Sequence, residues 1–311
     1  MRIVFMGTPE MAVPCLEALI EAGHQVIAVV TQPDRPKGRG GRTVAPPVKV
    51  SAEGHGIPVL QPKRVREPEF IEQVAALNPD AAVVIAFGQI LPQALLDIPK
   101  FGCINIHASL LPRYRGAAPI NWAIAEGERE TGLTTMRMDA GMDTGPTYLT
   151  AVTQIGPEDD TVSVTERLAR MAGPIVIETL ERVADGMRAV PQDDTLATMA
   201  PILKKGDGEI RWERPAREIV NRIRALLPWP GSHTTYGGEP WKVVKAKVGE
   251  GPAKDAQPGR IVRVDGDSIL VAAGEGGVRI LELQVPGKRA VSVRDFLNGR
   301  DVERGVVLGT D

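Results

Sequence analysis

Three polar side chains carry the chemistry that this sequence is equipped to do. Asn105 lies in a short apolar segment, residues 101–106, that is typical of a buried strand, and His107 follows it directly. Because side chains alternate between the faces of a strand, the amide and the imidazole point the same way at its carboxyl end, where open α/β sheets bind their ligands. A glycine-rich loop with two carboxylates, Asp139 and Asp143, follows later in the chain. An amide, an imidazole and a carboxylate suit acyl transfer to an amine, without a metal and without a covalent intermediate.

Each of these side chains also has a purely structural interpretation. His107 could be a core histidine satisfied by the backbone, and a metal site would need Cys103, which shares its strand parity. The chain has four histidines and no paired-ligand spacing, so we expect no metal. A turn aspartate often bonds its own backbone, whereas a carboxylate beside an imidazole orients and charges it. Spacing does not decide whether Asp139 or Asp143 has that second role.

The elements that must position these residues alternate between apolar runs and amphipathic segments. This pattern predicts an α/β domain with a Rossmann-like, mostly parallel sheet covered on both faces. We expect strands over 2–6, 25–30, 57–60, 80–87 and 102–107, an antiparallel pair over 132–138 and 146–154, and helices over 11–21, 47–53, 68–77, 119–126 and 161–185. Only Gly7 follows the first strand, so the G-x-G-x-x-G fingerprint is absent and NAD or FAD is disfavoured.

The pattern changes in the last third of the chain. Residues 190–208 are rich in Asp, Thr, Pro, Lys and Gly and are interpreted as a linker. An amphipathic helix over 215–226 is followed by short alternating runs at 241–248, 260–264, 268–272 and 278–283. Glycine-rich turns between such runs indicate a small OB-like β-barrel. We therefore expect a catalytic domain over 1–189, a linker over 190–208 and a C-terminal domain over 209–311.

Composition limits the class of protein. A chain of 311 residues with 43% hydrophobic and 24% charged residues is ordinary for a globular protein of two domains. Two cysteines in apolar segments, without a secretory signal or a membrane-spanning run, favour a cytoplasmic protein. Residues 209–311 carry 17 lysines and arginines against 14 acidic residues, whereas residues 1–208 carry 20 against 25. The C-terminal balance permits contact with nucleic acid without requiring it.

Residues 31–49 form an unusual basic insertion. Three glycines separate its basic side chains, and Asp34 is the single acidic residue; the basic residues are Arg35, Lys37, Arg39, Arg42 and Lys49. A charge run usually marks a solvated surface loop. The alternative is a basic finger, mobile alone, that becomes ordered on a polyanion. Composition alone does not decide between the two.

Taken together, these motifs resemble the methionyl-tRNA formyltransferases, a branch of the 10-formyltetrahydrofolate-dependent formyltransferase family, over nearly the whole chain. The pair N-x-H-x-S-L-L-P at residues 105–112 and D-x-x-x-D-T-G at 139–145 is specific to enzymes that use this folate. The basic insertion, with Pro228-Trp-Pro230 and Pro286-Gly-Lys288 near the C-terminus, narrows the resemblance to the tRNA branch.

The resemblance implies an enzyme of translation initiation. The donor would be 10-formyltetrahydrofolate, and the acceptor would be the α-amino group of methionine on initiator methionyl-tRNA. By the same resemblance the catalytic residues are Asn105, His107 and Asp143, the folate-binding residues are Ser109, Leu110, Leu111 and Pro112, and the tRNA-binding residues of the insertion are Arg39 and Arg42. We expect a monomer whose C-terminal barrel suits an oligonucleotide.

The implied chemistry fits these residues. As a neutral amine attacks the formyl carbon, negative charge grows on the formyl oxygen, to which Asn105 and a protonated His107 can donate. Asp143 would orient the imidazole and help a water remove the amine's proton.

Two other functions compete with this one. Another folate-dependent formyltransferase, acting on glycinamide ribonucleotide or an amino sugar, would not need the basic insertion or the barrel. An RNA-binding module with a vestigial α/β domain is opposed by the intact Asn105, His107 and Asp143.

Overall fold

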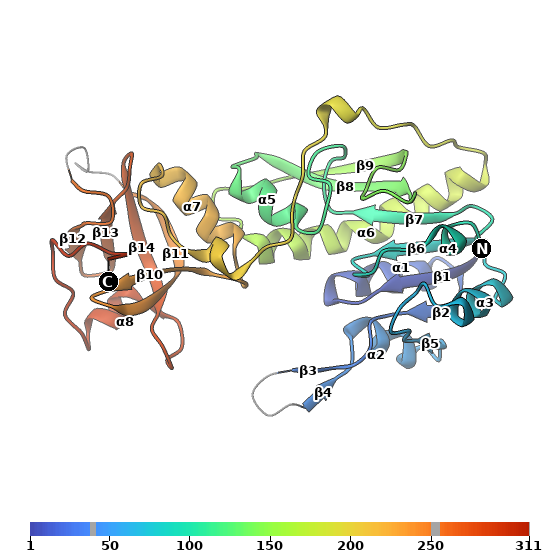
Figure 1. Ribbon diagram of the computed structural model, residues 1–311, viewed down its shortest axis with the longest axis horizontal. Coiled ribbons are helices and arrows are strands. Elements are labelled where there is room, and N and C mark those ends of the chain that lie inside the picture. The colour runs from blue at the N-terminus through green and yellow to red at the C-terminus, as the bar shows by residue number, and fades with distance from the viewer. Residues whose placement is uncertain (38–41, 250–255, 311) are drawn as a thin grey trace. The chain divides into compact units, whose positions relative to one another are not determined.

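The structure is a computed structural model that describes residues 1–37, 42–249 and 256–310. The chain divides into two compact units (Figure 1). Unit 1 consists of Met1–Pro119, Glu130–Gln154 and Thr165–Pro201, and unit 2 of Ile120–Arg129, Ile155–Val164 and Ile202–Asp311. In the described part of the chain, none of the helices combines the length and the apolar character needed to cross a bilayer. The domain boundaries expected at 189 and 209 stay predictions.

Unit 1 is built on one seven-stranded sheet in the order β5-β2-β1-β6-β7-β8-β9. The parallel strands are β1 (Arg2–Gly7), β2 (Gln25–Val30), β5 (Val59–Leu60), β6 (Ala81–Ile85) and β7 (Cys103–His107). Two antiparallel strands complete it: β8 (Glu130–Arg137) and β9 (Thr147–Gln154). β6 and β7 are buried at every residue because the strands of parallel sheets are covered on both faces. The predicted mostly parallel sheet with an antiparallel pair is confirmed.

Helices alternate with these strands. They are η1 (Glu10–Ala12), α1 (Val13–Glu21), α2 (Pro47–Gly54), α3 (Pro68–Ala76), α4 (Gln93–Leu96) and the long α6 (Thr161–Ala184). α2 and α3 begin at a proline, where the missing N–H costs no hydrogen bond. Thr179 of α6 hydrogen-bonds Thr135 of β8 at 2.9 Å, and Gly173 comes so close to Ala18 of α1 that a Cβ would clash. α6 therefore packs against both the sheet and α1.

The basic insertion forms a hairpin at its base. β3 (Arg35–Lys37) pairs antiparallel with β4 (Arg42–Val44), and Figure 1 shows the hairpin extending away from the sheet of unit 1. Lys49 forms an ion pair with Asp34 at 2.9 Å, and Gln61 donates to the same carboxylate at 2.7 Å. Arg39 lies outside the described residues, so its expected contact with tRNA and the expected mobility of the loop stay predictions.

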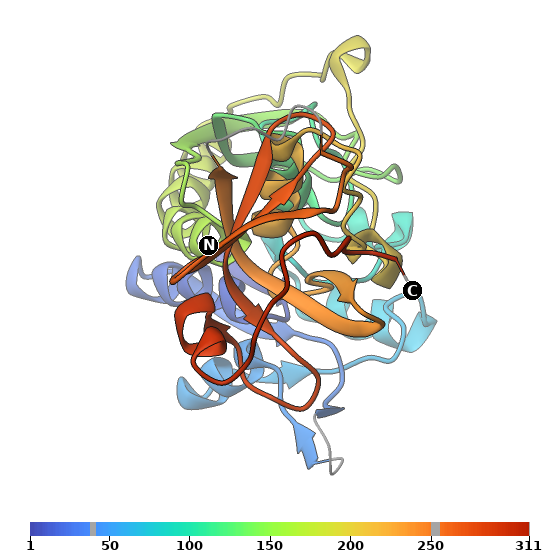
Figure 2. The same cartoon turned by 90° about the vertical axis from the view of Figure 1, so that its left-hand side faces the viewer.

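Unit 2 contains an antiparallel sheet in the order β10-β11-β14-β13-β12, with β15 (Val291–Ser292) beside β14. Its strands are β10 (Ser232–Tyr236), β11 (Glu239–Gly249), β12 (Ile261–Asp265), β13 (Ser268–Ala272) and β14 (Gly277–Gln284). Figure 2 looks onto these orange-to-red strands. The C-terminal residues hydrogen-bond to the chain at both edges of this sheet. Beside the β12 edge, the Leu308 amide donates to Gly259 O at 2.8 Å, and at the β10 edge the Gly309 amide donates to Thr235 O at 3.0 Å. The predicted C-terminal β domain is confirmed as an antiparallel sheet domain, and its closure into an OB-like barrel stays a prediction.

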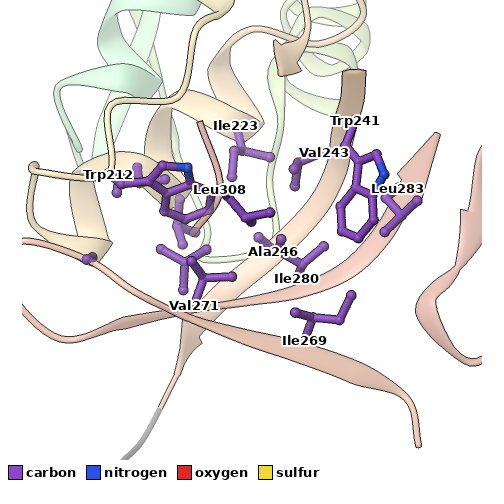
Figure 3. Close-up of a cluster of buried hydrophobic side chains, with 14 of the residues drawn as sticks. Trp212, Ile223, Trp241, Val243, Ala246, Ile269, Val271, Ile280, Leu283 and Leu308 are labelled. Atoms are coloured by element: carbon purple, nitrogen blue, oxygen red, sulfur yellow. The ribbon is translucent and has the colours of Figure 1, made fainter. Parts of the chain in front are cut away.

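The core of unit 2 lies between this sheet and α7 (Ala216–Ala225) (Figure 3). Trp241 is fully buried, stacks on Tyr236 with ring centroids 4.6 Å apart, and meets Phe296 of α8 (Val293–Leu297) edge-on at 5.4 Å. At the other end of α7, Asn121 of α5 (Pro119–Ala125) and Thr161 both donate to Ala225 O at 2.6 Å. Side chains therefore satisfy a carbonyl that the helix end leaves open.

We predict that Trp241→Ala lowers the free energy of unfolding by about 3–5 kcal/mol, because it removes a buried aromatic ring and leaves a cavity. Denaturant unfolding followed by circular dichroism measures the loss. Trp229→Ala is the matched control, since Trp229 is 55% exposed. Equal losses in the two variants would contradict the assigned core.

Candidate active site

Asn105 and His107 lie at the carboxyl end of β7, between parallel β6 and antiparallel β8. Both are nearly buried, with 9% and 6% of their surface exposed. Asn105 stands beside Val84 of β6, and His107 stands opposite Thr134 of β8. Their separation of two residues puts them on one face of the strand, which is the placement expected from the sequence.

The ring of His107 is held by a backbone carbonyl. Its Nε2 lies 2.9 Å from Tyr114 O, and since a carbonyl can only accept, Nε2 must carry the hydrogen. Its Nδ1 lies 3.6 Å from Asp143 Oδ2, which is longer than an ordinary hydrogen bond. The imidazole is thus anchored on one side and presents Nδ1 toward a carboxylate on the other.

The Asp143 carboxylate is fixed in turn by the Gly116 amide, which donates to Oδ2 at 2.9 Å. Asp139 is occupied elsewhere, because its Oδ1 accepts from the Gly141 amide at 3.0 Å and from Thr144 Oγ1 at 2.8 Å. Asp139 is exposed and caps its own turn. Of the two carboxylates that spacing left open, Asp143 is therefore the one that faces His107.

Unusual backbone conformations gather at this edge of the sheet. Four described residues other than glycine have a left-handed φ, and three of them flank the site: Ala86 (47°), Tyr114 (61°) and Asp143 (54°). Such conformations are unfavourable for side chains with a Cβ and persist where surrounding structure enforces them. The conformation of Tyr114 orients the carbonyl that accepts from His107, and that of Asp143 orients the carboxylate, which supports a functional role for the cluster.

Gln192 and Arg115 form a second layer behind Asp143. Gln192 Nε2 donates to Asp143 O at 2.8 Å and to Gly145 O at 2.7 Å. Its Oε1 accepts from Arg115 Nε at 3.1 Å and Nη2 at 2.8 Å. Sequence reasoning missed Gln192, because it lies in a segment whose composition suggests a linker and no local pattern marks it. Pairing of Val190 with Thr147 was the missing signal, and it is visible only in the fold.

The predicted folate-binding segment, residues 109–112, folds around Thr134. Thr134 Oγ1 donates to Ser109 O at 2.7 Å and accepts from the Leu111 amide at 3.1 Å. Ser109 is fully buried and its hydroxyl donates to Arg113 O at 2.6 Å. Leu110, Leu111 and Pro112 stay partly exposed and available to a ligand. Their binding role stays a prediction.

An open cavity of about 270 Å³ lies at the base of the basic hairpin. Its walls are largely proline and aliphatic, with Thr8, Gln32 and Arg35 as polar members. Thr8 Oγ1 and Gln32 Nε2 both donate to Phe87 O, at 3.1 and 3.3 Å, so the cavity is tied to the end of β6, next to β7. Arg42 is the first residue of β4, but its side chain is not among those that the structure describes, so its role in tRNA binding stays a prediction.

Cys103 is buried at the first residue of β7. Burial raises the pKa of the Cys103 thiol to about 12, and its Sγ points to Leu95 O at 3.9 Å. Among the residues that the structure describes, no three His, Cys, Asp or Glu side chains are grouped as a metal site requires. The expectation that the chain holds no metal stays a prediction.

The chain matches two family models. Residues 1–180 match "Formyl transferase", and residues 202–301 match "Formyl transferase, C-terminal domain". The methionyl-tRNA formyltransferase of Citrifermentans bemidjiense is 55% identical over 311 residues, covering 99% of this chain and 96% of the relative. That of Geobacter metallireducens is 54% identical over 310 residues, covering 99% of each. A solved structure of the N-formyltransferase from Helicobacter canadensis with folinic acid and dTDP-3-aminofucose aligns with a TM-score of 0.65 at 17% identity, covering 90% of this chain and 98% of that one.

We predict that neither cysteine reacts with iodoacetamide at pH 7.5 in the native protein, because burial raises the pKa of both thiols above the neutral range and the thiolate is the nucleophile. Mass spectrometry after timed labelling measures the modification, with the unfolded protein as control. Rapid labelling of Cys103 in the folded protein would show that the first residue of β7 opens to solvent.

Proposed function

Because the chain belongs to the formyl transferase family, as the motifs at residues 105–112 and 139–145 predicted, we propose that it transfers the formyl group of 10-formyltetrahydrofolate to the α-amino group of methionine on initiator methionyl-tRNA. Full-length relatives with the name methionyl-tRNA formyltransferase support this acceptor. The observation that carries the proposal is the convergence of Asn105, His107 and Asp143 at the carboxyl edge of the sheet. We place this reaction of translation initiation in the cytoplasm, with the enzyme acting as a monomer.

In the proposed mechanism Asn105 is a hydrogen-bond donor and His107 is a base. The Asn105 amide donates to the formyl oxygen as the amine attacks, and loss of such a donor typically costs about 10²–10³ in rate. The Nε2 hydrogen of His107 is already engaged by Tyr114 O, so Asn105 is the freer donor of the two. Nδ1, with Asp143 beside it, then takes the amine's proton directly or through a water. The same proton returns to N10 of the folate as the bond between N10 and the formyl carbon breaks, and tetrahydrofolate leaves. No step requires a metal or a covalent enzyme intermediate.

The pterin of the folate is assigned to the walls beside this site. We propose that it packs between residues 85–87, at the end of β6, and the segment 109–112. The partly exposed Leu110 to Pro112 offer apolar contacts, and the backbone of both segments offers hydrogen bonds, as small-ligand pockets require. Folate protection from hydrogen exchange is expected there, and protection confined to unit 2 would refute the assignment.

The acceptor end of the tRNA is assigned to the basic hairpin and the cavity at its base. Arg35 lines that cavity, and Arg39 and Arg42 continue the positive charge along the insertion. Phosphates attract such a segment, while the apolar walls suit the methionyl-adenosine end. The basic balance of residues 209–311 is consistent with a further contact to the polyanion.

A transfer assay with radiolabelled 10-formyltetrahydrofolate tests the function. We expect efficient formylation of charged initiator tRNA and negligible transfer to glycinamide ribonucleotide or to a nucleotide-linked amino sugar. Preference for either small acceptor would instead make the chain a different formyltransferase. Binding of tRNA without any transfer would support the RNA-binding module.

We predict that His107→Ala and Asp143→Asn each lower the rate of formyl transfer at least about 100-fold while the thermal midpoint stays close to that of the parent. Their losses should be non-additive, because the two residues act as one unit. Asp139→Asn is the matched control, since this neighbouring carboxylate serves only its own turn. If the single losses multiply in the double variant, Asp143 acts independently of His107.

We predict that Arg39→Ala lowers transfer to charged tRNA by about 10- to 100-fold through misplacement of the acceptor end, with folate affinity unchanged. Arg39→Lys should rescue poorly if a forked guanidinium contact matters and well if charge alone matters. Steady-state transfer and folate affinity are measured in parallel. Near-normal activity of Arg39→Ala would mean that the insertion is only a solvated loop.

A further inference from the structure

Gln192 uses every hydrogen-bonding group of its side chain within a few ångströms of the candidate site. A primary amide offers two N–H donors and two lone pairs. The donors go to Asp143 O and Gly145 O, and both lone pairs go to the guanidinium of Arg115. A side chain so fully committed has one orientation, and it fixes the two carbonyls on either side of Thr144.

The loop that these carbonyls belong to needs an external support. Asp143 has a φ of 54°, which is unfavourable for a residue with a Cβ. Met142 beside it is 57% exposed and supplies no core packing. Gly145 lies so close to Arg137 O that no Cβ would fit. The loop is therefore held by hydrogen bonds to Asp139 within it and by hydrogen bonds from Gln192 and Gly116 outside it.

Arg115 connects the two supports. Arg115 is nearly buried, and its guanidinium donates to Gln192 Oε1 and to the exposed Asp194 at 2.8 Å. The next residue, Gly116, donates its amide to the Asp143 carboxylate. Neighbouring residues thus hold Asp143 twice, the carboxylate through the backbone of Gly116 and the loop through the Arg115–Gln192 pair. Gly116 itself has a φ of 121° and no room for a Cβ beside Ala200 O.

We propose that Gln192, held by Arg115, is a positioning residue that keeps the Asp143 carboxylate against His107 during formyl transfer. This inference rests on the proposed function for its kinetic test. Gln192 contacts no reacting atom; it acts through the loop at residues 143–145. Errors of about 1 Å in the placement of a catalytic group can cost about 10²-fold in rate, so loss of Gln192 should appear in kcat rather than in KM.

The kinetic test compares four variants. Gln192→Ala should lower kcat by about 10- to 100-fold with KM for folate and tRNA little changed. Gln192→Glu keeps the shape and the pairing with Arg115 but cannot donate to the two carbonyls, so it should lose at least as much kcat as Gln192→Ala. Gln192→Ala combined with Asp143→Asn should match Asp143→Asn alone. Asp193→Ala removes the cap that accepts from the Thr195 amide at 3.0 Å in the same segment, and it should keep the parent kcat.

Hydrogen exchange provides a second test of the role of Gln192 that does not depend on activity. Hydrogen exchange at residues 139–145 should accelerate in Gln192→Ala and Gln192→Glu and stay unchanged in Asp193→Ala. Multiplying defects in the double variant, an equal kcat loss in Asp193→Ala, or unchanged exchange at the loop would each overturn the positioning role. If the parent protein failed to formylate methionyl-tRNA, the proposed function would fall, and the exchange experiment would still decide whether Gln192 holds the loop.

Discussion

The contact between the His107 ring and the Asp143 carboxylate is the constraint that the turns around the candidate site are arranged to satisfy. His107 Nδ1 and Asp143 Oδ2 lie 3.6 Å apart, although His107 ends a buried strand and Asp143 lies in a partly exposed loop. Such a pair can stay together only if both partners are held from behind. Tyr114 O holds the imidazole, and the Gly116 amide holds the carboxylate. Two residues within a three-residue stretch therefore set the geometry of the whole pair.

The backbone at this edge is shaped for that purpose at some energetic cost. Left-handed conformations at Tyr114 and Asp143 each disfavour folding by about 1–3 kcal/mol. The surrounding packing offsets them: β7 is buried throughout, and Thr134 on the adjoining strand ties down the segment that follows His107. The rigid strands thus support the turn at residues 114–116, which would not adopt its shape alone. The turn in its place holds the side chains of His107 and Asp143.

Much of the fold could be predicted from the hydrophobic pattern of the sequence. Apolar runs predicted β1, β2, β6 and β7 to within two residues at each end, because strands buried on both faces are largely apolar. β10, with its polar sequence Ser232–Tyr236, was missed, since its pairing with β11 rather than its composition makes it a strand. The hairpin in the basic insertion was missed for a similar reason, as prolines and glycines conceal a strand signal.

The site divides along the same line. Asn105 and His107 could be placed together from strand alternation alone, and two candidate carboxylates could be named. Spacing left the choice between Asp139 and Asp143 open, and only the family resemblance named Asp143 before its contacts were seen. The anchoring of His107 by Tyr114 O and the hydrogen bonds of Gln192 depend on the folded chain and have no local sequence pattern. The central claim, that Asp143 acts on a His107 ring fixed by Tyr114 O, is tested most directly by ¹⁵N NMR of the four histidines, with His107→Ala for assignment. Hydrogen on Nε2, and an Nδ1 shift that responds to Asp143→Asn while Nε2 does not, is the predicted result; hydrogen on Nδ1 with a bare Nε2 would contradict it.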